Sequence, residues 1–170
     1  MNCKELTVEK LIVKNPSGKG EIEISGHGIV FRDDRAVARL ELSLDYKDGC
    51  PEVSLSDANL QERIRLVLNG RGEPTIELLN GNNESAIWLT TECETRLCLY
   101  DRRGNARLDS WVDEDGHPII ELKDEFHKTS TQLALDYRGV LLATGHDAQG
   151  NKTWEWSATE DKAHPQRQEA

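Results

Sequence analysis

Residues 113–116, with the sequence DEDG, form the stretch that most resembles a cation site, because three carboxylates precede a glycine. A calcium loop of the EF-hand type needs oxygen ligands at further fixed positions and a closing glutamate. The next glutamate, Glu121, follows Gly116 too early for such a loop. The corresponding turns at 47–49 (KDG) and 70–72 (GRG) keep the glycine and lose two or all three of the carboxylates. The sequence therefore predicts a turn here and no metal site.

Residues that could perform catalysis are present but show no catalytic pattern. The histidines share no position in the chain's pattern; they are His27, His117, His127, His146 and His164. No nucleophile elbow, phosphate-binding loop or His-Glu-x-x-His motif occurs. The cysteines form no Cys-x-x-Cys pair, so we expect four reduced thiols: Cys3, Cys50, Cys93 and Cys98. The sequence predicts no catalytic residue, no metal, no cofactor and a protein that is not an enzyme.

The composition narrows the range of partners and locations. The chain has 170 residues, which favours one domain, and its formal net charge is −10. A chain this acidic is repelled by phosphate backbones, so we expect no nucleic-acid partner. No segment approaches the ~20 apolar residues of a membrane helix, so we expect no membrane span. The first ten residues lack the apolar run of a signal peptide, which favours a cytoplasmic location.

A repeat organises most of the chain. Seven Asp or Asn residues each close a short alternating apolar run; these anchors are Asn15, Asp33, Asp57, Asn80, Asp101, Asp124 and Asp147. Apolar residues stand two and four positions before an anchor and seven and nine after it, as Leu97, Leu99 and Leu108 do around Asp101. Alternation of this kind predicts strands with one apolar face. We therefore expect an all-β fold of about seven tandem β-hairpin repeats of ~22–23 residues, with about fourteen strands.

The turns agree with this pattern. A residue that tolerates positive φ stands three places after five of the anchors: Gly18, Asn83, Gly104, His127 and Gly150. We expect a two-residue primed turn centred two and three places after the anchor, which sets position −2 opposite +7. Ala36 and Leu60 occupy the third place after Asp33 and Asp57, so we expect those two turns to be longer or of another type. Second turns, between hairpins, are predicted at 47–51, 70–74, 113–118 and 136–139.

Four aromatic and arginine residues are predicted on the polar face. Trp88 and Trp111 follow their anchors by eight and ten residues, and the register sets Trp111 opposite Arg96 and Tyr100 opposite Arg107. Such pairs can serve only to stabilise a sheet, by ~0.5–1 kcal/mol at exposed sites. They can also form a binding face for a sugar or a partner protein. We predict Trp88, Arg96, Tyr100 and Trp111 as the candidate binding residues, and both interpretations stay open.

The last repeat differs from the others. Trp154 and Trp156 occupy apolar-face positions, where we expect them to cap the end of the core. The alternation ends after Ser157. We therefore expect a single β-repeat domain over residues 1–157 and a disordered polar tail over 158–170.

The predicted apolar face must be covered. An open sheet of this many strands can coil into a solenoid or prism, close as a barrel, form a few-bladed propeller, or assemble with copies of itself. Aromatic residues make up only 5% of the chain, which is little for a self-contained β core, and near-equal repeats extend along an axis. We therefore expect a coiled or prism-like sheet whose apolar face is buried inside a solenoid or at an oligomer axis, with a trimer favoured.

The repeat is clearest at 97–109 (LCLYDRRGNARLD), with DEDGHP at 113–118 after it, and at 6–25. It resembles short Asp-x-x-Gly β-hairpin repeats of uncharacterised bacterial proteins, and the resemblance covers most of residues 6–157. This resemblance implies an architecture and no activity. The sequence thus predicts a non-enzymatic structural or protein-interaction protein. The alternatives are a carbohydrate-binding, lectin-like module and an enzyme with catalytic residues on separate loops.

Overall fold

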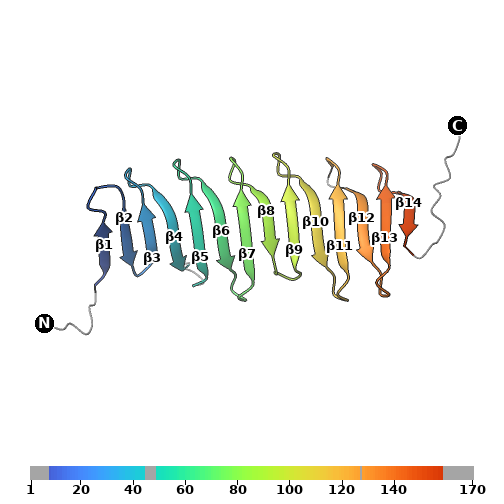
Figure 1. The fold of residues 1–170 in the computed structure, drawn as a ribbon, viewed down its shortest axis with the longest axis horizontal. Helices are drawn as coiled ribbons and strands as arrows, with labels where there is room; N and C mark the ends of the chain where they lie inside the picture. Colours follow the sequence, from blue (N-terminus) through green and yellow to red (C-terminus); the bar gives the residue numbers. More distant parts are fainter. Residues whose placement is uncertain (1–7, 45–48, 127, 159–170) are drawn as a thin grey trace. The chain divides into compact units, whose positions relative to one another are not determined.

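The computed structural model describes residues 8–44, 49–126 and 128–158 (Figure 1). Every regular element within those ranges is a β-strand, and all strand pairs are antiparallel, which confirms the predicted all-β hairpin repeat. The fourteen described strands fall into two compact units: unit 1 is Met1–Cys93 and unit 2 is Glu94–Ala170. The predicted tail lies, from residue 159 onward, outside the described residues, as do Cys3, His127 and His164.

Unit 1 is an antiparallel meander in which each strand pairs with its sequence neighbours. Its strands are β1 (Lys10–Lys14), β2 (Glu21–Ser25), β3 (Gly28–Arg32), β4 (Ala38–Leu44), β5 (Pro51–Ser56), β6 (Glu62–Leu68), β7 (Pro74–Leu79) and β8 (Ser85–Thr90). Unit 2 continues the same pattern. Its strands are β9 (Arg96–Tyr100), β10 (Ala106–Val112), β11 (Pro118–Lys123), β12 (Thr129–Leu135), β13 (Leu141–His146) and β14 (Lys152–Ser157).

An Asp or Asn begins nine of the turns between the described strands, at both edges of each meander. Its Oδ1 accepts hydrogen bonds from the backbone N–H groups two and four residues later, at 2.8–3.2 Å. The residues that do so are Asp33, Asp57, Asn69, Asn80, Asp101, Asp113, Asp124, Asp136 and Asp147. The acidic stretch at 113–116 is therefore one of these corners, with Asp113 as its first residue.

These turns are not the primed turns that we predicted. In the Asp101 turn, Gly104 N–H donates to the Asp101 carbonyl at 3.1 Å and Asp101 N–H donates to the Asn105 carbonyl at 2.9 Å. Gly104 alone in this turn has a positive φ, of 78°. The turn is thus a type I turn followed by a left-handed residue, with a three-residue loop. In this form, backbone N–H groups of the loop can donate hydrogen bonds to the side-chain oxygen of the anchor. A two-residue turn does not offer these donors.

The predicted register is nevertheless confirmed, because a bulge offsets the different turn. Leu99 pairs with Leu108 and Leu97 with Ser110, at positions −2/+7 and −4/+9 around Asp101. Between Ala106 and Leu108 the register shifts by one residue, so Arg107 has no partner across the strand pair. The same shift occurs after five other anchors. An extra bulged residue returns the apolar side chains of both strands to one face.

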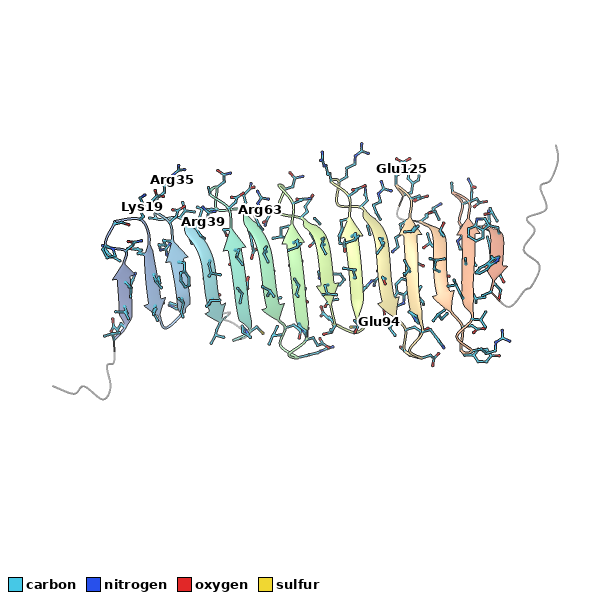
Figure 2. The ribbon with its side chains drawn as sticks, in the orientation of Figure 1. Lys19, Arg35, Arg39, Arg63, Glu94 and Glu125 are labelled. Atoms are coloured by element: carbon cyan, nitrogen blue, oxygen red, sulfur yellow. The ribbon has the colours of Figure 1, made fainter. Side chains whose placement is uncertain are left out.

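The bulged position explains the arginines six residues after an anchor. Arg107 Nε donates to Asp101 Oδ2 at 2.8 Å, and Arg63 Nε donates to Asp57 Oδ2 at 2.9 Å. Arg39 donates through Nη1 to Asp33 Oδ2 at 3.2 Å, and through Nε to the Ser56 carbonyl of the following hairpin at 2.9 Å. Figure 2 shows Arg39 and Arg63 at the edge of unit 1 that carries the anchor turns. At these three anchors the arginine thus connects the anchor to its own bulge. Arg39 and Arg63 also connect two successive turns, since Arg63 Nη1 donates to the Asn80 carbonyl.

Ala36 and Leu60 form the same turn as glycine does, which corrects our prediction of longer or different turns. Their φ angles are 62° and 63°, and each N–H donates to the carbonyl of its anchor, at 3.0 and 3.2 Å. The side-chain hydrogen bonds of the anchor hold both residues in a conformation that costs a non-glycine residue roughly 1–2 kcal/mol. The turn geometry therefore prevails over the local preference of the residue.

Replacing Leu60 by glycine should stabilise unit 1. The Leu60 side chain is 65% exposed, so its loss removes little burial, while the strain of its positive φ disappears. We expect Leu60→Gly to raise the free energy of unfolding by about 1 kcal/mol in urea denaturation at a fixed protein concentration. The matched control is Gly104→Ala, which should lower it by a similar amount. Equal stability of all three proteins would contradict this account of the turn.

Candidate functional site

The apolar face is the most extensive candidate site. In unit 1 two rows of paired side chains run without interruption across all eight strands. One row is Leu11, Ile24, Ile29, Leu42, Val53, Leu66, Ile76 and Leu89, and the other is Val13, Ile22, Phe31, Leu40, Leu55, Ile64, Leu78 and Ile87. With strands ~4.8 Å apart, each row is about 34 Å long. The face is therefore a continuous apolar surface and not a set of separate contacts.

Unit 2 carries the same two rows with smaller residues among them. One row is Leu97, Ser110, Ile120, Leu133, Ala143 and Trp156, and the other is Leu99, Leu108, Leu122, Thr131, Gly145 and Trp154. The Trp154 ring lies over Gly145, where an added Cβ would be 1.9 Å from Nε1 of the indole. Trp154 and Trp156 are still 48% and 47% exposed. The two tryptophans thus cover small residues of β13 and remain half-exposed themselves, so the predicted cap covers little more than this strand.

No second layer covers either apolar face within the described residues. The exposed residues of the unit 1 rows have accessible fractions between 36%, at Ile87, and 49%, at Val13. Cys98 and Ala143 are the only buried apolar residues in the described ranges. Neither meander closes on itself, because the described strands pair only with their sequence neighbours. The coiled or prism-like closure stays a prediction.

The opposite face of unit 2 contains a buried carboxylate. Asp109, 1% exposed, accepts hydrogen bonds from Arg96 Nε at 2.7 Å, from Arg96 Nη2 and from Lys123 Nζ at 2.8 Å. The Cys98 thiol donates to Oδ1 at 3.2 Å. Burial alone would raise the pKa of Asp109, but the hydrogen bonds of Arg96, Lys123 and Cys98 outweigh it and hold that pKa well below its ordinary value. Asp109 is therefore an anion at neutral pH, and its hydrogen bonds join three strands.

The pKa values of neighbouring side chains are shifted in the same cluster. Burial, followed by the hydrogen bond to Asp109 and the charge of Asp109, raises the pKa of the Cys98 thiol, although Tyr100 and Arg96 oppose this. Burial also raises the pKa of Tyr100 to about 12. A thiol and a phenol in this state are protonated at neutral pH and are poor nucleophiles. The cluster is thus suited to holding strands together and not to nucleophilic chemistry.

The four predicted binding residues lie in both units and are half-buried. Trp88 stands opposite Glu77 in unit 1. In unit 2, Trp111 stands opposite Arg96 as predicted, with the guanidinium 5.5 Å from the centre of the indole. Tyr100 stands opposite Ala106, so the predicted pair with Arg107 is wrong, because Arg107 is the bulged residue. The structure therefore places Arg96 between Trp111 and Asp109, and a binding role for the four residues stays a prediction.

Sequence reasoning did not identify Asp109, Lys123 or the role of Cys98. The register itself would have set Cys98, Asp109 and Glu121 side by side on the polar face. Arg96 reaches Asp109 diagonally, as Arg65 reaches Glu52 at 3.0 Å in unit 1. Opposite charges on diagonal positions of the predicted register were the signal that could have revealed the cluster.

No group of three or more His, Cys, Asp or Glu side chains in the described ranges is arranged to hold a metal ion. No helix in those ranges is long and apolar enough to span a bilayer. Searches with protein-family models and among curated proteins found no match to this chain. The resemblance to Asp-x-x-Gly repeats therefore stays a prediction. The features that bear on function are the apolar and polar faces.

Removing the Asp109 carboxylate should destabilise unit 2. Asp109→Asn loses the charge that Arg96 and Lys123 share, and we expect the free energy of unfolding to fall by about 2 kcal/mol. The matched control is Glu155→Gln, whose carboxylate pairs with Lys152 at the exposed surface and should matter little.

The same pair of variants tests the effect of acid. The lowered pKa of Asp109 means that its stabilisation is complete above the unfolded-state pKa of ~3.9 and is lost as the pH falls below it. Denaturation at pH 6 and pH 3 should therefore show a smaller acid-induced loss for Asp109→Asn than for the wild type. A loss as large in Asp109→Asn as in the wild type would show that this carboxylate does not contribute.

Proposed function

We propose that this chain is a non-enzymatic structural or protein-interaction protein that associates with copies of itself through its apolar face. The supporting observation is the apolar surface that no described residue covers, with Cys98 and Ala143 as the only buried apolar residues in those ranges. A sheet with one apolar face is stable only when that face packs on another element. The association therefore supplies the core that each copy lacks.

The form of the face supports another copy as the partner. Its rows repeat with the spacing of the strands, and sheets that pack face to face interlock side chains across ~10 Å with nearly aligned strands. A second copy brings an apolar surface with the same spacing. The charged residues that would oppose contact lie on the other face, where Arg65, Glu52 and Glu77 already pair. Association of three copies, with apolar faces toward a common axis, is the form that we favour.

The polar face is a weaker candidate for binding. A sugar or partner protein at Trp88, Arg96, Tyr100 and Trp111 would meet an arginine that is already held by Asp109 and stacked on Trp111. Within the described residues, we found no feature in a surface hollow or on either face that favours an enzyme with loop-borne catalytic residues. A cytoplasmic location and the absence of a nucleic-acid partner remain part of this proposal.

Light scattering of the purified chain tests the proposal. We expect a mass of several chains, three in the favoured form, and a lower mass for Leu133→Lys, which places a charge on the apolar face of β12. Gln132→Lys is the matched control, because it introduces the same charge at the adjacent position on the opposite face. A wild-type protein with the mass of one chain at all concentrations, or equal effects of both variants, would contradict self-association through this face.

A further inference from the structure

The apolar face of unit 1 contains a hollow at one end of three neighbouring strands. It has a volume of about 270 Å³ and lies among residues of β5, β6 and β7, which are side by side in Figure 1. The residues of the apolar face that line it are Pro51, Val53, Leu66, Leu68, Pro74 and Ile76. Glu52, Val67 and Thr75 also border it, although their positions alternate to the opposite face. Ligand pockets usually measure ~300–1,000 Å³, so this hollow is suited to one large side chain more than to a small molecule.

The hollow exists because prolines begin two of these strands. Pro51 and Pro74 are the first residues of β5 and β7, and Leu68, the last residue of β6, pairs with Pro74. The short proline rings rise less above the sheet than the leucine and isoleucine side chains in the adjacent row. Leu68 remains 37% exposed at the wall of the hollow. The result is an apolar depression that the described residues do not fill.

The apolar face of unit 2 carries the complementary shape. Trp154 and Trp156 occupy apolar-face positions of β14, and each is nearly half exposed. The contact of Trp154 with Gly145 supports that ring against the backbone, so less freedom is lost when it is buried. Tryptophan buries ~150–250 Å² when it is fully covered and is among the residues most enriched at the centres of interfaces. Within the described residues, these two are the exposed aromatic side chains of the apolar rows.

We propose that Trp156 of one copy, the knob, inserts into the β5–β7 hollow of a second copy. This inference rests on the proposed self-association and specifies which surfaces meet. Trp156 stands in the row of unit 2 that corresponds to the row of Val53, Leu66 and Ile76 in unit 1, so the knob and this part of the hollow lie equally far along the strands from the anchor turns. Large side chains that face small ones interlock without voids.

The arrangement predicts a head-to-tail assembly. The knob and the hollow are different surfaces of the chain, so each copy can use its knob on one neighbour and receive a knob from another. Such contacts close into a ring when the rotation between copies allows it, and three copies would make the trimer that we favour. A face-to-face dimer in which both copies use the same residues is the competing geometry.

Two variants that each lack one half of the contact test the inference. Trp154→Ser/Trp156→Ser removes the knob, and Leu68→Arg places a charge in the hollow. Val67→Arg is the matched control for the second, because Val67 is adjacent on β6 and lies on the opposite face, across from Glu52. In sedimentation velocity, each of the two should have the mass of a single chain, whereas Val67→Arg should keep the wild-type mass.

Mixing the two variants provides the decisive measurement. The intact knob of Leu68→Arg can enter the intact hollow of the double tryptophan variant, so a 1:1 mixture should contain a two-chain species. If circular dichroism shows that the double variant has lost its strand signal, Trp156→Ser alone, which keeps the Trp154 contact with Gly145, replaces it in the mixture.

The outcomes separate this inference from the proposed function. Single chains in the mixture would overturn the knob-and-hollow contact, as would wild-type mass for both variants. If both keep the wild-type mass while Leu133→Lys loses it, self-association through the apolar face holds and this contact does not. A wild-type protein that is itself a single chain at every concentration overturns both proposals, and would be the result if the tryptophans docked within their own chain or awaited an unrelated partner.

Discussion

The structure depends on one repeated interaction, in which the side-chain oxygen of an Asp or Asn accepts hydrogen bonds from two backbone N–H groups of the turn that follows. Asp101 does this with Arg103 and Asn105, and the uncharged Asn80 does the same with Asn82 and Glu84. The interaction selects the turn, sets the left-handed residue three places on and closes the strand pair. Because it recurs at both edges, each strand returns with its apolar side chains on the same face.

The two faces then differ in how their side chains are satisfied. On the polar face, charged groups find partners within the sheet, as Asp109 does with Arg96 and Lys123. On the apolar face, the rows have no covering layer among the described residues, and half-exposed tryptophans end them in unit 2. The free energy available for binding is therefore concentrated on one face. Repetition of a small motif, and not a pocket with special chemistry, gives the described part of this protein its extended apolar surface.

The register shows why a correct prediction can follow from an incorrect turn. A two-residue primed turn and a three-residue turn with a bulge at the sixth position both set Leu99 opposite Leu108. The apolar pattern constrains only which residues share a face, so it cannot distinguish the two. It did not predict that Arg107 is unpaired, and the pair of Tyr100 with Arg107 was wrong for that reason. Ala36 and Leu60 were misjudged because the hydrogen bonds of the anchor outweigh the local cost of a positive φ.

The sequence by itself determined the fold class, the number of hairpins, the strand register and the membership of the apolar rows, because alternation and turn residues are local signals. Only the tertiary structure decided how each turn closes, which arginines join an anchor to its bulge, and that Asp109 is buried among Arg96, Lys123 and Cys98. It also decided that the apolar rows stay uncovered and that a hollow opens beside Pro51 and Pro74. These features depend on side chains from strands that only the folded meander brings into contact, and no local pattern specifies those contacts.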